Sequence, residues 1–148
     1  MPPVSRRDQH RSHVHRGGGV GAGLVAGVYT AFSVVVMPAL RRRPAAEGAA
    51  LMQEVNRVIV NPVFVLLFAG TGVLAVVAAV LDTRAVVGAV LYVLGSIGLT
   101  VVADIPLNNT LDADGERVWS RYLSRWTAWN HVRALATTAA TVALVVAA

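Results

Sequence analysis

Apolar residues along this chain gather in four long segments that contain no charged residue. The segments cover residues 20–40, 63–81, 85–103 and 134–148. Because a helix needs about 20 apolar residues to cross the hydrocarbon core of a bilayer, each segment can supply one membrane span. The last segment is slightly short, so its helix is expected to begin earlier, near Trp126. The pattern predicts four spanning helices with both chain ends on one side.

A soluble helical bundle is the alternative to this membrane interpretation. Its helices would carry a polar stripe facing water, whereas the four segments are apolar all round. Composition favours the membrane, because 55% of the residues are hydrophobic, only 14% are charged, and the mean hydropathy is +0.60. We therefore expect an all-α fold, a four-helix transmembrane bundle over residues 17–148. The expected surroundings are a lipid bilayer, specifically a bacterial plasma membrane.

The first 16 residues have a different composition, with four Arg, three His and few apolar residues. Such a segment buries too little apolar surface to fold, so the sequence predicts a disordered basic tail. All 13 basic residues of the chain are Arg, which together with abundant Ala, Val and Gly indicates a compositional bias rather than a nucleic-acid-binding surface. The absence of Cys excludes disulfides, thiolate ligands and a cysteine nucleophile.

The first connection, residues 41–61, is long enough for a short amphipathic helix at the membrane interface. Its apolar stripe is expected to contain Leu51, Val55, Val58 and Ile59. The second connection is a tight turn at residues 82–84, and the third, residues 104–125, is polar and contains a further helical stretch. In a four-span protein, the first and third connections lie on the same side of the membrane.

The distribution of Arg favours a cytoplasmic location for that side. The first and third connections carry seven Arg, whereas the tail and the short turn together carry five. Basic residues near spans concentrate on the cytoplasmic side.

Two features of the first span concern helix packing. Gly19, Gly23 and Gly27 share one face and would allow close approach of another helix, either within the bundle or in a homo-oligomer. Pro38 is expected to stop or kink the helix before the three Arg at 41–43.

A cluster of polar residues interrupts the apolar sequence at the side of the first and third connections, and any chemistry of the protein is expected there. Asp104 is costly to insert into a bilayer, so it should face protein or water, either as a helix cap or as a functional group. The cluster comprises Asn56, Asn61, Asp104, Asn108, Asn109, Trp126, Asn130, His131 and Arg133.

The fourth span carries aromatic residues and an Arg at helical spacing. Tyr122, Trp126, Trp129 and Arg133 are separated by four, three and four residues and therefore share one face. This arrangement offers cation–π contact and an anion clamp, although a simple interfacial aromatic belt explains it equally well. His131 is the only His outside the tail and is the candidate general base, with a structural role as the alternative.

A metal site has little support in the sequence. One His, one Asp and several amides are available near the membrane boundary, without Cys or a pair of His at metal-binding spacing. Motifs for dinucleotides, nucleotide phosphates, covalent haem or serine hydrolases are also missing. We therefore expect no resident metal or cofactor.

Several short motifs follow one another along the chain. They are the Gly-rich first span with Val36-Met37-Pro38-Ala39-Leu40, then Met52-Gln53-Glu54-Val55-Asn56-Arg57, Asn61-Pro62, Ile105-Pro106-Leu107-Asn108-Asn109 and Trp126-Thr127-Ala128-Trp129-Asn130-His131-Val132-Arg133. In this order they resemble a bacterial and fungal membrane protein family that contains the anthrone oxygenases of aromatic polyketide pathways. The resemblance covers the chain from about residue 17 to its end. It implies a four-helix membrane protein that oxidises an anthrone-like aromatic substrate or hydroquinone with O2 and without a cofactor.

The resemblance also suggests roles for the polar residues. His131 would remove a proton from the substrate, with Asp104 orienting it or acting instead. Arg133, Asn108 and Asn130 would stabilise the resulting oxyanion. The expected substrate-binding residues are Asn56, Asn61, Asn108, Trp126, Trp129 and Asn130. The alternative is a non-enzymatic membrane protein that binds or transports a small molecule or a lipid headgroup. A third possibility is a packing subunit built around the glycine face.

Overall fold

The computed structural model describes residues 6–148 as a bundle of helices. The first long helix comprises α1 (Arg6–Ala31), the π-helix η1 (Phe32–Val36) and α2 (Met37–Arg41), and is followed by α3 (Ala45–Ile59) and α4 (Pro62–Leu81). After the turn η2 (Thr83–Ala85), a second composite helix contains α5 (Val86–Tyr92), the π-helices η3 (Val93–Gly98) and η4 (Thr100–Asp104), and α6 (Ile105–Asp114). The turn η5 (Gly115–Val118) leads to α7 (Trp119–Val146). The all-α prediction is confirmed.

Three helical stretches are long and apolar enough to cross a membrane. They are Ser12–Arg41, Pro62–Leu81 and Thr83–Val146. The last contains both the third and the fourth predicted spans, because helical hydrogen bonding continues through η5. The chain nevertheless reverses there at Gly115, whose φ of 55° is a conformation that residues with a Cβ rarely adopt.

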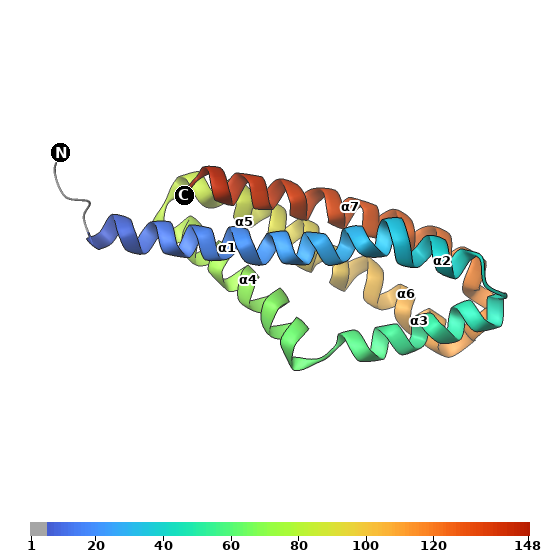
Figure 1. The fold of residues 1–148 in the computed structure, drawn as a ribbon. Coiled ribbons are helices and arrows are strands. Elements are labelled where there is room, and N and C mark those ends of the chain that lie inside the picture. Colours follow the sequence, from blue (N-terminus) through green and yellow to red (C-terminus); the bar gives the residue numbers. More distant parts are fainter. Residues whose placement is uncertain (1–5) are drawn as a thin grey trace.

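The ends of the bundle have the arrangement predicted from the connections. α3, α6 and the start of α7 lie together at one end, whereas the C-terminus, the start of α5 and the N-terminal part of α1 lie at the other (Figure 1). At that second end the ring of His15 lies 3.0 Å from the carbonyl oxygen of Ala147. The residues of the first and third connections are therefore gathered at the same end of the molecule.

The N-terminal part of α1 differs from the predicted tail. Residues 6–16 continue the first long helix, and His15 is buried against the end of α7. Composition suggested disorder because it counts only the apolar side chains within the segment. The structure instead stabilises this segment through the neighbouring helix, while the first five residues lie outside the described part.

The two π-helices η1 and η4 precede prolines at equivalent positions. Pro38 follows η1 and Pro106 follows η4 by two residues. Proline lacks an N–H, and its ring crowds the carbonyl four residues earlier, which here lies inside the π-helix. The wider π turn accommodates that carbonyl, so the helix containing Pro38 continues to Arg41. Both π-helices contribute side chains to the cavity described below.

The amphipathic helix expected in the first connection is α3. Of its predicted apolar stripe, Leu51 and Val58 are exposed, and Val55 and Ile59 are partly buried. The fully buried positions are Gly48, Ala49 and Met52, because α3 packs closely against Trp119 at the start of α7.

Gly48 is expected to be required for this packing. A Cβ at this position would lie 2.7 Å from Cζ2 of Trp119, and the ring is held by stacking on Tyr122. Gly48→Ala should therefore separate α3 from α7 and destabilise the protein by about 1–3 kcal/mol. Thermal unfolding in detergent measures this effect. Gly27→Ala is the control, since nothing lies within 4 Å of its Cβ position; equal melting temperatures for the two variants would contradict the packing role of Gly48.

Two of the three glycines in the predicted stripe pack within the bundle. A Cβ at Gly19 would lie 2.8 Å from Val145, and one at Gly23 would lie 3.4 Å from Thr141, both on α7. Gly27 is exposed and has open space beside it. Gly19 and Gly23 are thus engaged by the chain's own last helix. Of the three glycines predicted to mediate a homo-oligomer, only Gly27 is left available for contact with another copy of the chain.

Candidate active site

A cavity of ≈ 240 Å³ lies at the end of the bundle where α3 and α6 pack. Side chains from α1, η1, α3, α4, η4, α6 and α7 surround it. Most are apolar or aromatic, and the polar ones come from a few positions on η4, α6, α7 and α3. An apolar cavity with few polar groups is typical of a site for a small organic molecule, and this one is slightly below the usual volume of about 300–1,000 Å³.

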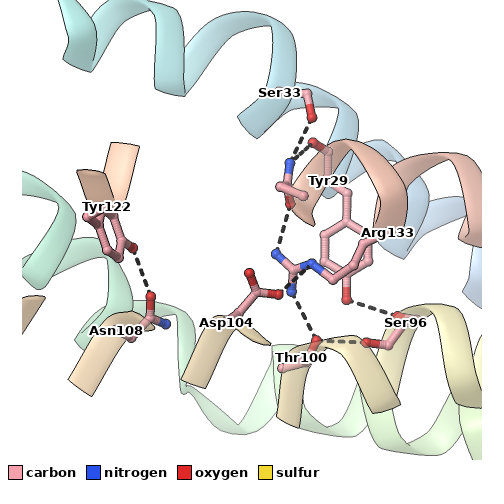
Figure 2. Close-up of polar contacts among 9 residues, drawn as sticks. Tyr29, Ser33, Ser96, Thr100, Asp104, Asn108, Tyr122 and Arg133 are labelled. Atoms are coloured by element: carbon pink, nitrogen blue, oxygen red, sulfur yellow. Dashed lines mark hydrogen bonds and ion pairs between the residues drawn. The ribbon is translucent and has the colours of Figure 1, made fainter. Parts of the chain in front are cut away.

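Arg133 on α7 is the centre of the polar network in this cavity (Figure 2). Its Nε lies 2.8 Å from Oδ2 of Asp104, and both side chains are buried. Its Nη1 donates to Oγ1 of Thr100 at 2.9 Å, and its Nη2 donates to Oδ1 of Asn130 at 2.8 Å. A guanidinium has five N–H donors, and these two hydrogen bonds use one on each Nη, so each Nη keeps one N–H for another oxygen.

Two aromatic rings lie against the guanidinium of Arg133. Its central carbon lies 4.3 Å from the ring centroid of Tyr29 and 5.4 Å from that of Trp126. These distances fit cation–π interactions, which the spacing of Arg133 and the tryptophans suggested. The Tyr29 hydroxyl is also fixed, because it shares a hydrogen bond of 2.9 Å with Ser96 on η3. Arg133 is thus held in place from several directions.

Asn130 positions Arg133 against the first helix. Its Nδ2 donates to the Tyr29 carbonyl and to Oγ of Ser33, both at 2.8 Å, while its Oδ1 accepts from Arg133. Both amide hydrogens and one oxygen lone pair are therefore used within the protein. These contacts hold the Arg133 guanidinium in place. Asn130 also lines the cavity, so its predicted part in substrate binding stays a prediction.

Asp104 has unused capacity to accept hydrogen bonds. Neither carboxylate oxygen receives a hydrogen bond from a residue in the described part of the chain, although Oδ2 is paired by charge with Arg133. Leaving a buried carboxylate oxygen without a donor is costly, so such an atom often marks a place where a ligand binds or reacts. Asp104 lines the cavity and can present Oδ1 to a ligand as a hydrogen-bond acceptor or a base.

A second polar group, formed by the side chains of Tyr122, Asn108 and Asn56, lies at another part of the cavity wall. Tyr122 on α7 donates to Oδ1 of Asn108 at 2.8 Å, and Asn56 on α3 lies within 3.5 Å of the same hydroxyl. Asn56 and Asn108 line the cavity, as expected for substrate-binding residues. The two polar groups lie apart in Figure 2, with Asp104 and Arg133 forming one and Tyr122 and Asn108 the other.

Three predicted site residues lie outside this cavity. His131 and Trp129 are exposed on α7, and neither lines the cavity. Asn61 caps α4, with its side-chain oxygen accepting from the Phe64 N–H at 3.0 Å. The structure therefore brings together Asp104, Arg133 and Trp126 but not the candidate base His131. A helix advances 100° per residue, which turns His131 away from the face shared by Asn130 and Arg133.

Four residues of the polar network were not predicted from the sequence. Two lie on the first long helix and two on the composite helix that contains η3 and η4. Tyr29, Ser33, Ser96 and Thr100 look like ordinary residues of apolar spans, and no motif marks them. The available signal was Pro38 and Pro106, since each proline follows a π-helix that faces the cavity. Within residues 6–148, no three His, Cys, Asp or Glu side chains gather in a way that could hold a metal ion.

Together, the fold and this site define a helical-bundle protein in which an apolar cavity contains a buried acidic and basic pair. The chain belongs to the anthrone oxygenase family, whose model matches residues 50–143. The match includes Asp104, Arg133 and the second polar group, but it begins after the Gly-rich helix and Pro38. Searches of curated proteins and of solved structures found no match.

Proposed function

We infer that this protein is a membrane-embedded oxygenase that converts an anthrone-like aromatic substrate to the corresponding quinone with O2. Family membership supports an oxygenase-like role. The observation that supports the chemistry is the buried Asp104 beside Arg133 in the wall of an apolar cavity. The three long apolar helical stretches support the location in a membrane.

The chemistry begins with removal of a proton from the substrate. The methylene group of an anthrone is acidified by the two aromatic rings and by the carbonyl on the opposite side of the central ring. Asp104 would accept this proton on Oδ1, and negative charge would develop on the carbonyl oxygen. The free N–H groups of Arg133 would stabilise that oxyanion within an apolar cavity.

Oxidation follows because the resulting anion is rich in electrons. One electron passes to O2, and the two radicals combine to form a carbon–oxygen bond. Protonation gives a hydroperoxide, which loses the second methylene proton as its O–O bond breaks. One anthrone and one O2 thus give one anthraquinone and one water, and this balance requires no further reductant. The protein contributes the base, the oxyanion partner and the apolar surroundings.

The planar shape of an anthrone also matches the cavity walls. Trp126 and Phe32 lie 5.6 Å apart between ring centroids, and Phe64 and Phe68 form a second aromatic pair on α4. All four line the cavity and can pack against a flat aromatic molecule. Asn56 and Asn108 would interact with polar substituents at another edge of the substrate.

The direct test is O2 uptake by the purified protein in detergent with a panel of anthrones and hydroquinones. The protein should accelerate oxidation above the spontaneous rate and consume one O2 for each quinone formed. Metal content is measured on the same preparation, and an O2 uptake that follows metal content would contradict the cofactor-free route. An unchanged oxidation rate across the panel would favour the non-enzymatic binding or transport role.

The two candidate bases can be distinguished by His131→Ala. Because His131 is exposed and outside the cavity, this change should leave the rate of substrate oxidation within about twofold of the parent protein. The measurement is kcat for quinone formation, monitored by absorbance. A loss of a hundredfold or so would be the size expected for removing a general base and would return that role to His131.

A further inference from the structure

The rim of the cavity differs in chemistry from its interior. Three residues line the cavity and yet are substantially exposed: Val60 (72%), Val65 (45%) and Ile105 (44%). They mark where the cavity opens, and all three are apolar. Deeper in the wall, Asp104, Asn130 and Arg133 are buried. The most exposed part of the cavity wall is thus apolar, whereas the acidic and basic pair lies in its buried part.

This opening lies on the side of the bundle, between α4 and the start of α6. Val60 and Val65 flank the turn at Asn61-Pro62 where α4 begins, and Ile105 is the first residue of α6. In Figure 1, α4 diverges from α1 towards this turn, and α3 returns from it. The opening is thus beside a helix that is apolar enough to span a membrane, rather than at the polar tip of the bundle.

Along the length of the bundle, the cavity opening lies where two apolar segments end. The stretch Pro62–Leu81 starts at the opening, and the uncharged segment 85–103 ends just before it. The exposed ion pair of Arg57 and Glu54, at 2.9 Å, lies less than two turns before Val60 on the polar side. In a membrane, this places the opening near the boundary between headgroups and acyl chains.

Molecules with an apolar aromatic body and polar edges concentrate at that boundary, as Trp and Tyr side chains do. Building on the oxygenase function proposed above, we propose that the cavity opens laterally to the bilayer and takes an aromatic substrate dissolved in the membrane. The substrate would move past Val60, Val65 and Ile105 without crossing water. Asp104 and Arg133 would then meet it inside.

The test uses the full-length protein in phosphatidylcholine vesicles with anthraquinone and a series of its 2-alkyl derivatives, product-like probes that differ in how strongly they partition into lipid. Binding is followed after rapid mixing by quenching of tryptophan fluorescence, with every probe at the same aqueous concentration. Lateral entry predicts an association rate that rises in proportion to the mole fraction of the probe in the membrane. Equal association rates across the series would show entry from water and overturn the lateral route.

Bulky substitutions at the opening provide a second measurement. Val65→Phe should slow association and dissociation by about tenfold, since it narrows the opening without altering the polar groups. Val63→Phe is the matched control, because Val63 is on the same helix, is 78% exposed and does not line the cavity. Ile105→Phe and Val102→Phe form an equivalent pair, with Val102 70% exposed and also outside the cavity.

These measurements are independent of catalysis, so the two proposals can fail separately. Equal association rates for the opening and control variants would overturn lateral entry even if the protein consumes O2. Retained lateral binding without O2 uptake would instead remove the oxygenase function. No quenching by anthraquinone in the unmodified protein would contradict lateral entry, while O2 uptake alone decides the oxygenase function.

Discussion

Asp104→Asn is expected to lower kcat for anthrone oxidation by about 100-fold to 10,000-fold, because it removes the general base while preserving the shape of the side chain. Apparent KM should change little, since Trp126, Phe32 and the asparagines would still contact the substrate. The measurement is steady-state quinone formation under saturating O2. A fall in binding affinity with unchanged kcat would instead make Asp104 a substrate-binding residue.

A structural role for Asp104 must be separated from proton removal. The carboxylate is paired with buried Arg133, so Asn at this position also leaves a cation without its counterion. Two controls address this. The melting temperature reports the structural effect, and a substrate deuterated at the methylene group reports the chemical step. A primary isotope effect in the parent protein would show that proton removal limits the rate, and its absence together with full activity of Asp104→Asn would contradict the mechanism.

Arg133→Leu is expected to affect both stability and activity. Removing one partner of a buried ion pair costs about 3–5 kcal/mol, because the remaining charge has no compensation. Loss of the oxyanion partner should also lower kcat by about 100-fold to 1,000-fold. Unfolding in detergent and O2 uptake measure the two effects. The large stability loss is expected because Arg133 also holds Thr100 and Asn130.

A double substitution distinguishes these two roles of Arg133. Asp104→Asn with Arg133→Leu removes both charges, so it should recover part of the stability lost in Arg133→Leu alone. Its activity should remain as low as that of either single variant, because base and oxyanion partner act in the same step. Recovery of both stability and activity would mean that the pair serves folding only.

The helical segments and the location of the polar residues could be predicted from the sequence. Uninterrupted apolar segments with no charge leave few alternatives to long helices, and the short turn at 82–84 fixes how two of them are connected. The side shared by the first and third connections followed from counting the spans. Asp104, Arg133 and Trp126 were therefore placed at the same end of the bundle before any contact between them was known.

Finer assignments failed where they depended on which way a side chain points. His131 follows Asn130 directly, and only the packing of α7 against its neighbours shows that Asn130 faces the interior and His131 does not. The buried face of α3 could not be predicted for a related reason, because only the packing of Trp119 shows that Gly48, and not Leu51, faces the bundle.

By itself, the sequence determined that this protein is helical, which segments are long and apolar enough to cross a bilayer, and that its few polar groups collect at one end. These properties depend on composition and on separations along the chain, which the sequence contains directly. Only the tertiary structure decided that Asp104 and Arg133 share a cavity, that Tyr29 and Thr100 hold the guanidinium, and that the opening faces sideways. Those properties depend on helix rotation and on the π turns before Pro38 and Pro106, which arise from packing between distant segments.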